Sequence, residues 1–150
     1  MGRIVVGVDG SEQCGAALEW ALAEAALRGA TLEAVCAYRL PSGWLGMGEA
    51  MGATMPVSLT ESDVEVYAKD ALDRMLDAAG GHGPVEVVRR AVAGHAAQVL
   101  VEASDGADLL VVGSRGHGDV GSLLLGSTGM HCVHHAGCPV VVVRGGPAGR

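Results

Sequence analysis

The chain has 150 residues, 49% of them hydrophobic and 18% charged, with a formal net charge of −7. This composition is typical of an ordered globular domain and excludes an intrinsically disordered chain. The net negative charge argues against a general surface for nucleic acid or anionic membrane. We predict a single domain over residues 1–150, with a core at about 3–144 and a flexible tail at 145–150.

The first elements follow from a β-branched run and the helical spacing after it. Residues 3–8 (RIVVGV) predict a buried strand that ends at an Asp-Gly pair. Apolar residues at helical spacing then continue to Gly29, which predicts a helix with a glycine stop. A second strand is expected over Thr31–Tyr38. Residues 39–59 show no clear period and predict a loop of about twenty residues, a length that is often functional.

Helices and strands go on alternating in the rest of the chain. Thr60 and Asp63 resemble a capping box and predict a helix that ends at Gly80-Gly81. Further strands are expected at 85–92, 108–113 and 139–144, and further helices at 95–104 and 127–135. Arg89 and Arg90 place the third strand near an edge. The alternation predicts an α/β fold with a five-stranded, doubly wound parallel sheet and helices on both faces.

Residues 113–129 (GSRGHGDVGSLLLGSTG) hold six glycines and one acid, directly after the most apolar predicted strand. Glycine in an ordered loop marks either a positive φ or a close approach of the backbone to something else. Two phosphate-loop patterns fail here. The G-x-G-x-x-G match at 116–121 has no acid about 20 residues later, and a Walker A loop needs a lysine that this stretch lacks.

A third pattern fits, namely G-x2-G-x9-G-S, set by Gly113, Gly116, Gly126 and Ser127. The first two glycines allow a sharp turn off the strand, and the last two residues begin the final helix. Unpaired N–H groups and the positive end of the helix dipole make such a start a site for phosphate. Thr128 adds a second hydroxyl. In doubly wound parallel sheets, ligands bind beyond the carboxyl ends of the strands at the point where strand order reverses.

Charge favours an anion in the same part of the chain. From Gly113 onward the net charge is +2, which leaves −9 for the rest. Arg115 and His117 lie within the glycine-rich stretch and supply positive charge. Residues 131–138 (HCVHHAGC) also admit a zinc site, but no CxxC or HExxH pattern accompanies them, so we predict no metal ligands there.

The two ends of the chain and the glycine spacing together resemble the sequence pattern of a known protein family. A chain that starts IVVGVDGS, contains G-x2-G-x9-G-[ST] after a strand, and ends CPVVVVR resembles the universal stress protein family. It looks like the ATP-binding branch of that family. The resemblance covers about Arg3 to Arg144 and implies that the five strands of the sheet lie in the order 3-2-1-4-5.

The resemblance implies a role for particular residues. Asp9, followed by Gly10, would contact the adenine or its sugar, and the backbone at Ala37 would hold the adenine. The ribose and phosphates would face Val112, Gly113, Ser114, Arg115, Gly116 and His117, and the phosphates would be closed in by Gly126, Ser127 and Thr128. Two positions depart from the family pattern: His117 stands where a larger basic residue is common, and Gly129 lowers the helix propensity of the last helix's first turn.

The resemblance also implies a homodimer formed through the last strand, Pro139–Arg144, and a nucleotide-dependent module of the stress response. ATP, with Mg²⁺, is the expected ligand. AMP or cyclic AMP, a slow nucleotide hydrolase, and a structural dimer without ligand remain alternatives. We predict no enzyme, because neither a general base nor a carboxylate pair for Mg²⁺ accompanies the glycine loop.

The sequence also bears on where the protein works. Its start lacks the features of a secretory signal, no apolar run reaches the roughly 18 residues of a membrane span, and the four cysteines form no CxxC pair. These features predict a cytoplasmic protein with reduced cysteines, without a membrane segment or a nucleic-acid partner.

Overall fold

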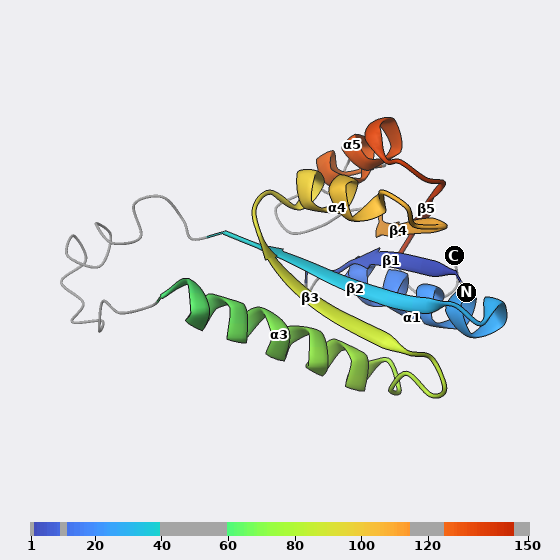
Figure 1. Ribbon diagram of the computed structural model, residues 1–150, viewed down its shortest axis with the longest axis horizontal. Helices are drawn as coiled ribbons and strands as arrows, with labels where there is room; N and C mark the ends of the chain where they lie inside the picture. Colours follow the sequence, from blue (N-terminus) through green and yellow to red (C-terminus); the bar gives the residue numbers. More distant parts are fainter. Residues whose placement is uncertain (1, 10–11, 40–59, 115–124, 146–150) are drawn as a thin grey trace.

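A computed structural model describes residues 2–9, 12–39, 60–114 and 125–145 (Figure 1). The predicted long loop at 40–59, the middle of the glycine-rich stretch and the tail at 146–150 lie outside these residues. The described chain alternates strand and helix: β1 (Arg3–Gly7), α1 (Glu12–Arg28), β2 (Thr31–Tyr38), α3 (Glu61–Ala78), β3 (Val87–Ala93), α4 (Ala96–Ser104), β4 (Leu109–Gly113), α5 (Ser127–His135) and β5 (Val140–Val143).

The five strands form one sheet in the order β3-β2-β1-β4-β5, and every pair is parallel. This confirms the predicted fold class and strand order, including the position of β3 at an edge. The chain fills one side of β1 with β2 and β3 and then crosses to the other side with β4. The strand order therefore reverses between β1 and β4, whose residues are almost all buried.

Helices cover both faces of the sheet, as Figure 1 shows: α1 and α3 lie on one face and α4 and α5 on the other. Under α1 and α3 the core is aliphatic and includes Leu18 and Leu72. Under α4 and α5 it includes Val99, Leu110 and Cys132. Burying both faces of the strands explains why their sequences are apolar throughout rather than alternating.

Helix boundaries follow local signals. Gly29 ends α1 with φ 64°, a conformation that favours glycine. The predicted capping box at the start of α3 is confirmed: the Asp63 amide donates to the Thr60 hydroxyl at 3.3 Å, and the Thr60 amide donates to the Asp63 carboxylate at 2.8 Å. Local chemistry thus sets where these elements begin and end.

A buried carboxylate ties the amino ends of the sheet together. Glu33 in β2 is 7% exposed. Its carboxylate accepts from Arg3 of β1 at 2.8 Å and from Arg90 of β3 at 2.6 Å. Arg3 also donates its second guanidinium nitrogen to the Asp105 carbonyl oxygen at 2.7 Å, and its amide donates to the Asp108 carboxylate at 2.7 Å. Charged groups in this region therefore satisfy one another.

The other sheet edge is the four-residue strand β5, which is composed of valines and pairs with β4. It lies within the predicted Pro139–Arg144 strand, and each valine is half-buried. Over the described ranges, no helix is long and apolar enough to cross a membrane.

Candidate functional site

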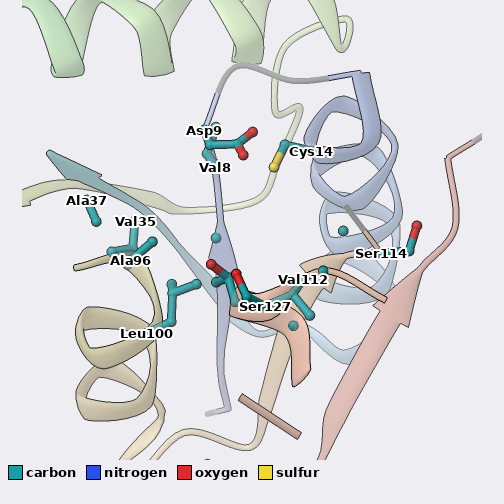
Figure 2. Close-up of a pocket in the computed structure, with 15 residues that line it drawn as sticks. Val8, Asp9, Cys14, Val35, Ala37, Ala96, Leu100, Val112, Ser114 and Ser127 are labelled. Atoms are coloured by element: carbon teal, nitrogen blue, oxygen red, sulfur yellow. The ribbon is translucent and has the colours of Figure 1, made fainter. Parts of the chain in front are cut away.

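A cavity of about 250 Å³ lies at the carboxyl ends of β1 and β4, where the strand order reverses. Figure 2 shows its walls, which come from the ends of the strands and from the starts of α4 and α5. We call it the first cavity. Eight residues proposed from the sequence line it: Asp9, Ala37, Val112, Gly113, Ser114, Gly126, Ser127 and Thr128. The structure thus brings both halves of the predicted site together, while the role of each residue in binding stays a prediction.

The other four predicted residues, Gly10, Arg115, Gly116 and His117, lie outside the described residues. The two described glycines of the spacing can be examined. Gly126 has φ −69°, and Gly113 is not among the described glycines with positive φ. A positive φ is therefore not the reason for glycine at either position.

Two backbone hydrogen bonds hold the start of α5 at the sheet. The Ser114 amide donates to the Val143 carbonyl oxygen at 2.9 Å, and the Gly126 amide donates to the Ser114 carbonyl oxygen at 2.7 Å. Ser114 is 4% exposed. The chain leaves β4 and returns as α5 over the same strand end, so the helix start has a fixed position beside the cavity.

Gly129 permits the close packing of this first helical turn. An added Cβ would lie 2.6 Å from Leu125 Cδ1 and 3.6 Å from the Gly113 carbonyl oxygen. The residue is buried and lines the first cavity. A side chain at this position would displace the tip of Leu125, a contact that the sequence alone does not reveal.

The start of α5 presents backbone donors at the cavity. Gly126 is the N-cap, and no side chain among the described residues caps this helix start. The first turn of any α-helix leaves N–H groups without a helical acceptor, and the dipole adds partial positive charge there. The hydroxyls of Ser127 and Thr128 stand on the same turn. This end of the first cavity is suited to an anionic oxygen group.

The opposite side of the first cavity is apolar. Val8, Val35 and Leu100 are buried and line it together with the half-buried Ala37. Asp9 stands at the exposed rim, directly after β1. An apolar wall beside a few polar groups is the usual composition of a small-molecule pocket.

Asp9 acts electrostatically on the neighbouring strand end. Burial raises the pKa of the Cys36 thiol in β2, and the charge of Asp9 raises it further. The carboxylate is therefore close enough to β2 to disfavour a second negative charge there. A ligand group placed between β1 and β2 meets an acceptor rather than a donor at Asp9.

Several lining residues escape sequence reasoning, among them Cys14, Val35, Ala96 and Leu100. Cys14, on the first turns of α1, appears near Asp9 in Figure 2. One signal was available: all loops that leave the carboxyl ends of parallel strands meet at one edge. The first turns of α1 and α4 are therefore expected beside the predicted binding site at the ends of β1 and β4.

A second cavity of about 530 Å³ adjoins the first. The two share Ala37, Ala96, Ser127 and Thr128 as lining residues. The rest of the second cavity's lining differs in kind, because it carries Arg39, His95 and His131, together with Ala97. The sequence singles out His131 only as part of a possible zinc site, and it assigns no site role to Arg39, His95 or Ala97.

The described residues contain no group of three or more His, Cys, Asp or Glu side chains arranged to hold a metal. His131 and His135 lie one helical turn apart with ring centroids 4.5 Å apart. All four cysteines are free, and burial raises the pKa of the Cys132 thiol to about 11. Cys132 packs as a small apolar group within the core, while Cys36 and Cys138 are partly buried and pack against it.

Two comparisons link the chain to known sequences. The model of the universal stress protein family matches residues 1–144. A universal stress protein of Mycolicibacterium smegmatis is 36% identical over 144 residues, which are 95% of this chain and 48% of that protein. One from Thermus aquaticus, named for a QAH/OAS sulfhydrylase 3′ region, is 33% identical over 151 residues and is covered to 97%. The chain thus spans about half the length of the mycobacterial relatives it matches.

Comparison with solved structures leads to the same family. A universal stress protein crystallised in complex with cAMP is 27% identical, with a TM-score of 0.68, and the match covers 97% of this chain and 98% of that one. Sequence, family pattern and fold all lead to the same assignment. The chain belongs to the universal stress protein family.

Proposed function

We propose that this protein binds ATP, with Mg²⁺, in the first cavity and acts as a dimeric, nucleotide-dependent regulatory module of the ATP-binding branch. The observation that carries the proposal is the uncapped start of α5, held at the carboxyl end of β4 beside an apolar wall. The apolar side would take the adenine at Ala37 and the sugar at Asp9. The phosphates would lie at Gly113, Gly126, Ser127 and Thr128.

Cyclic AMP or AMP is the second candidate ligand. A relative of the same fold, 27% identical, has been solved with cAMP. The first cavity, at about 250 Å³, is small for a whole nucleoside triphosphate, since ligand pockets usually measure about 300–1,000 Å³. Comparison of ATP, AMP and cAMP in one titration series therefore separates the candidates.

We propose binding rather than catalysis. Among the described residues that line the first cavity, the single carboxylate is that of Asp9. Phosphoryl transfer to water needs a positioned base or a metal held by further acidic ligands. A slow hydrolysis of bound ATP is compatible with the site, and the cysteines support a reducing compartment such as the cytoplasm.

We propose that dimers form through β5. A strand edge composed of valines, without charged residues inside it, tends to pair with another strand. Pairing of two copies across a two-fold axis would cover both edges at once. Sedimentation would report a mass twice that of the chain.

The experiment that tests the ligand is calorimetric titration with ATP and Mg²⁺ on the wild type and on Gly113→Ala with Gly126→Ala. We expect micromolar binding by the wild type and at least about tenfold weaker binding by the double variant, because added methyl groups would hold phosphate away from the backbone donors. AMP and cAMP are titrated in parallel.

Gly15→Ala is the matched control. An added Cβ at Gly15 meets nothing within 4 Å, and the residue lies inside α1. This variant keeps its affinity and the double variant keeps its circular dichroism spectrum if the glycines act on the ligand. Absence of binding by the wild type at millimolar ATP, AMP and cAMP would falsify the proposal.

A further inference from the structure

Three exposed histidines lie on the second half of α5, namely His131, His134 and His135. His131 and His135 are one helical turn apart, and their ring centroids are 4.5 Å apart with the ring planes tilted by 41°. The ring centroid of His134 lies 6.3 Å from that of His135, because neighbouring residues of a helix project about 100° apart. The helix thus presents a close pair of exposed imidazoles at positions i and i+4.

The distance between the two rings suits one metal ion. An imidazole nitrogen binds Zn²⁺ at about 2.0–2.1 Å, which places the ring centroid about 3.2 Å from the ion. Two rings on one tetrahedral ion then have centroids roughly 5 Å apart. The observed 4.5 Å is close to this value, so a small rotation of two exposed side chains brings both rings onto one ion.

The same spacing supplies the two histidine ligands of the H-E-x-x-H motif, whose glutamate is the general base of zinc hydrolases. In this chain the position of that glutamate is Cys132. Its side chain lies within the core, and burial raises the pKa of the thiol to about 11. The pair therefore has the arrangement for holding an ion, while the position of the base is taken by a buried thiol.

The carboxyl end of α5 favours a cation. His135 stands in the last turn, where carbonyl groups lack a helical partner and the dipole adds partial negative charge. The described residues contain no group of three or more side chains arranged to hold a metal. Two protein ligands leave at least two positions of a four-coordinate ion to water or to an anionic ligand. We therefore expect an exchangeable ion rather than a structural one.

Other described histidines and thiols are less suited to the same ion. His82 uses its Nδ1 in a contact of 2.9 Å with a backbone carbonyl oxygen. The ring of His95 lies against the guanidinium of Arg39, which repels a second cation. Burial raises the pKa of the partly buried Cys36 and Cys138 thiols, so the thiolate that a metal requires is disfavoured.

We propose that His131 and His135 form a binding site for a divalent transition-metal ion that prefers imidazole, such as Ni²⁺ or Zn²⁺. The inference stands apart from the proposed nucleotide site, since it depends on two exposed side chains of one helix. His131 also lines the second cavity, so an ion on the pair lies at the edge of that cavity.

The test is calorimetric titration of the full chain with Ni²⁺, without an affinity tag and without nucleotide. We expect one ion per chain, with a dissociation constant on the order of 10–100 µM. His131→Gln and His135→Gln should each weaken binding at least about tenfold, because each leaves a single imidazole. Excess Zn²⁺ should displace the bound Ni²⁺. Circular dichroism checks the fold of each variant.

His134→Gln is the matched control, because His134 is an exposed histidine of the same helix that lies outside the close pair. Its affinity for Ni²⁺ should stay at the wild-type value. Millimolar Ni²⁺ should also raise the urea midpoint of the wild type and of this control, but not of the two pair variants.

Three results would overturn the inference: no binding by the wild type at millimolar Ni²⁺, unchanged binding by both pair variants, or an equal loss of affinity in His134→Gln. None of them bears on the nucleotide proposal, because the titration contains no nucleotide. A failure of ATP, AMP and cAMP to bind would in turn leave the metal site standing.

Discussion

The two ends of the sheet treat polar groups in opposite ways. At the amino ends, the Glu33 carboxylate is buried and paired with Arg3 and Arg90. At the carboxyl ends, α4 and α5 start without side-chain caps, and their first turns line two adjoining cavities. At the amino ends the charged side chains pair with one another, whereas at the carboxyl ends the backbone donors of two helix starts face the cavities.

This difference separates stability from binding within one sheet. Paired charges at the amino ends hold three strands in register, because one carboxylate accepts from residues on both neighbouring strands. Uncapped helix starts forgo a contribution of about 1 kcal/mol each that an N-cap side chain usually supplies. We expect variants at the two ends to change different measured quantities.

The largest effect is expected at the amino ends. Glu33→Ala leaves two guanidinium groups without their carboxylate, and we expect the free energy of unfolding in urea to fall by about 2 kcal/mol. Both arginines retain partial exposure, with 33% and 48% of their side chains accessible, so water restores some of the loss. ATP affinity should stay at the wild-type value.

Glu65→Ala is the control for this variant, because Glu65 pairs with Lys69 on the exposed side of α3. Its free energy of unfolding should change by no more than about 0.5 kcal/mol. If the Glu33 and Glu65 variants unfold at the same urea concentration, the network at the amino ends contributes nothing special to stability.

A smaller effect with opposite signs is expected at the carboxyl ends. His95→Asp gives α4 a capping carboxylate, which should raise the free energy of unfolding by about 1 kcal/mol. The same carboxylate faces Arg39 and the second cavity, so we expect ATP to bind about tenfold more weakly. Urea unfolding and calorimetry measure the two changes.

His95→Ser supplies a cap without the charge. The free energy of unfolding of this variant should rise by about as much as that of His95→Asp. Its ATP affinity should fall by less than that of His95→Asp. Equal losses of affinity in the two variants would mean that the imidazole itself matters, and not the charge next to Arg39.

The most modest expected change is a pH dependence of the docking of α5. Burial raises the pKa of Cys132 from 9.0 to about 11, so the folded state favours the neutral thiol. Its contribution to stability is complete below pH 9 and is lost as the pH rises towards 11. Cys132→Ala should therefore show a shallower decline of unfolding free energy between these values. Parallel declines in wild type and variant would contradict this assignment.

Much of the fold could be predicted because the decisive signals are local. The bounds of β2 and α5 agree with the predicted ranges, since Gly29 ends the helix before the first and a glycine-serine start marks the second. Arg89 and Arg90 gave the edge position of β3. Alternation of the two element types then fixes a parallel sheet, and the order follows from the family resemblance and from right-handed crossovers.

The features that could not be predicted from the sequence depend on contacts between segments that lie far apart in the chain. Arg39 and His95 are 56 positions apart and meet because the Gly94 amide donates to the Tyr38 carbonyl oxygen at 2.9 Å, which joins the ends of β2 and β3. Gly94 has φ 141°, a turn that glycine permits. Glu33 is likewise an unexpected acid in a buried strand, and only its pairing with Arg3 and Arg90 on the two neighbouring strands explains it.

The uncapped starts of α4 and α5 have a further consequence. Helix ends fray first, and backbone amides without an acceptor exchange their hydrogens with solvent fastest. A nucleotide bound between α4 and α5 would accept hydrogen bonds from these amides, as an N-cap side chain does in other helices. The occupied protein would then differ from the empty one mainly in how long these two helical turns stay closed, and a partner that recognises the closed turns would detect the nucleotide without touching it.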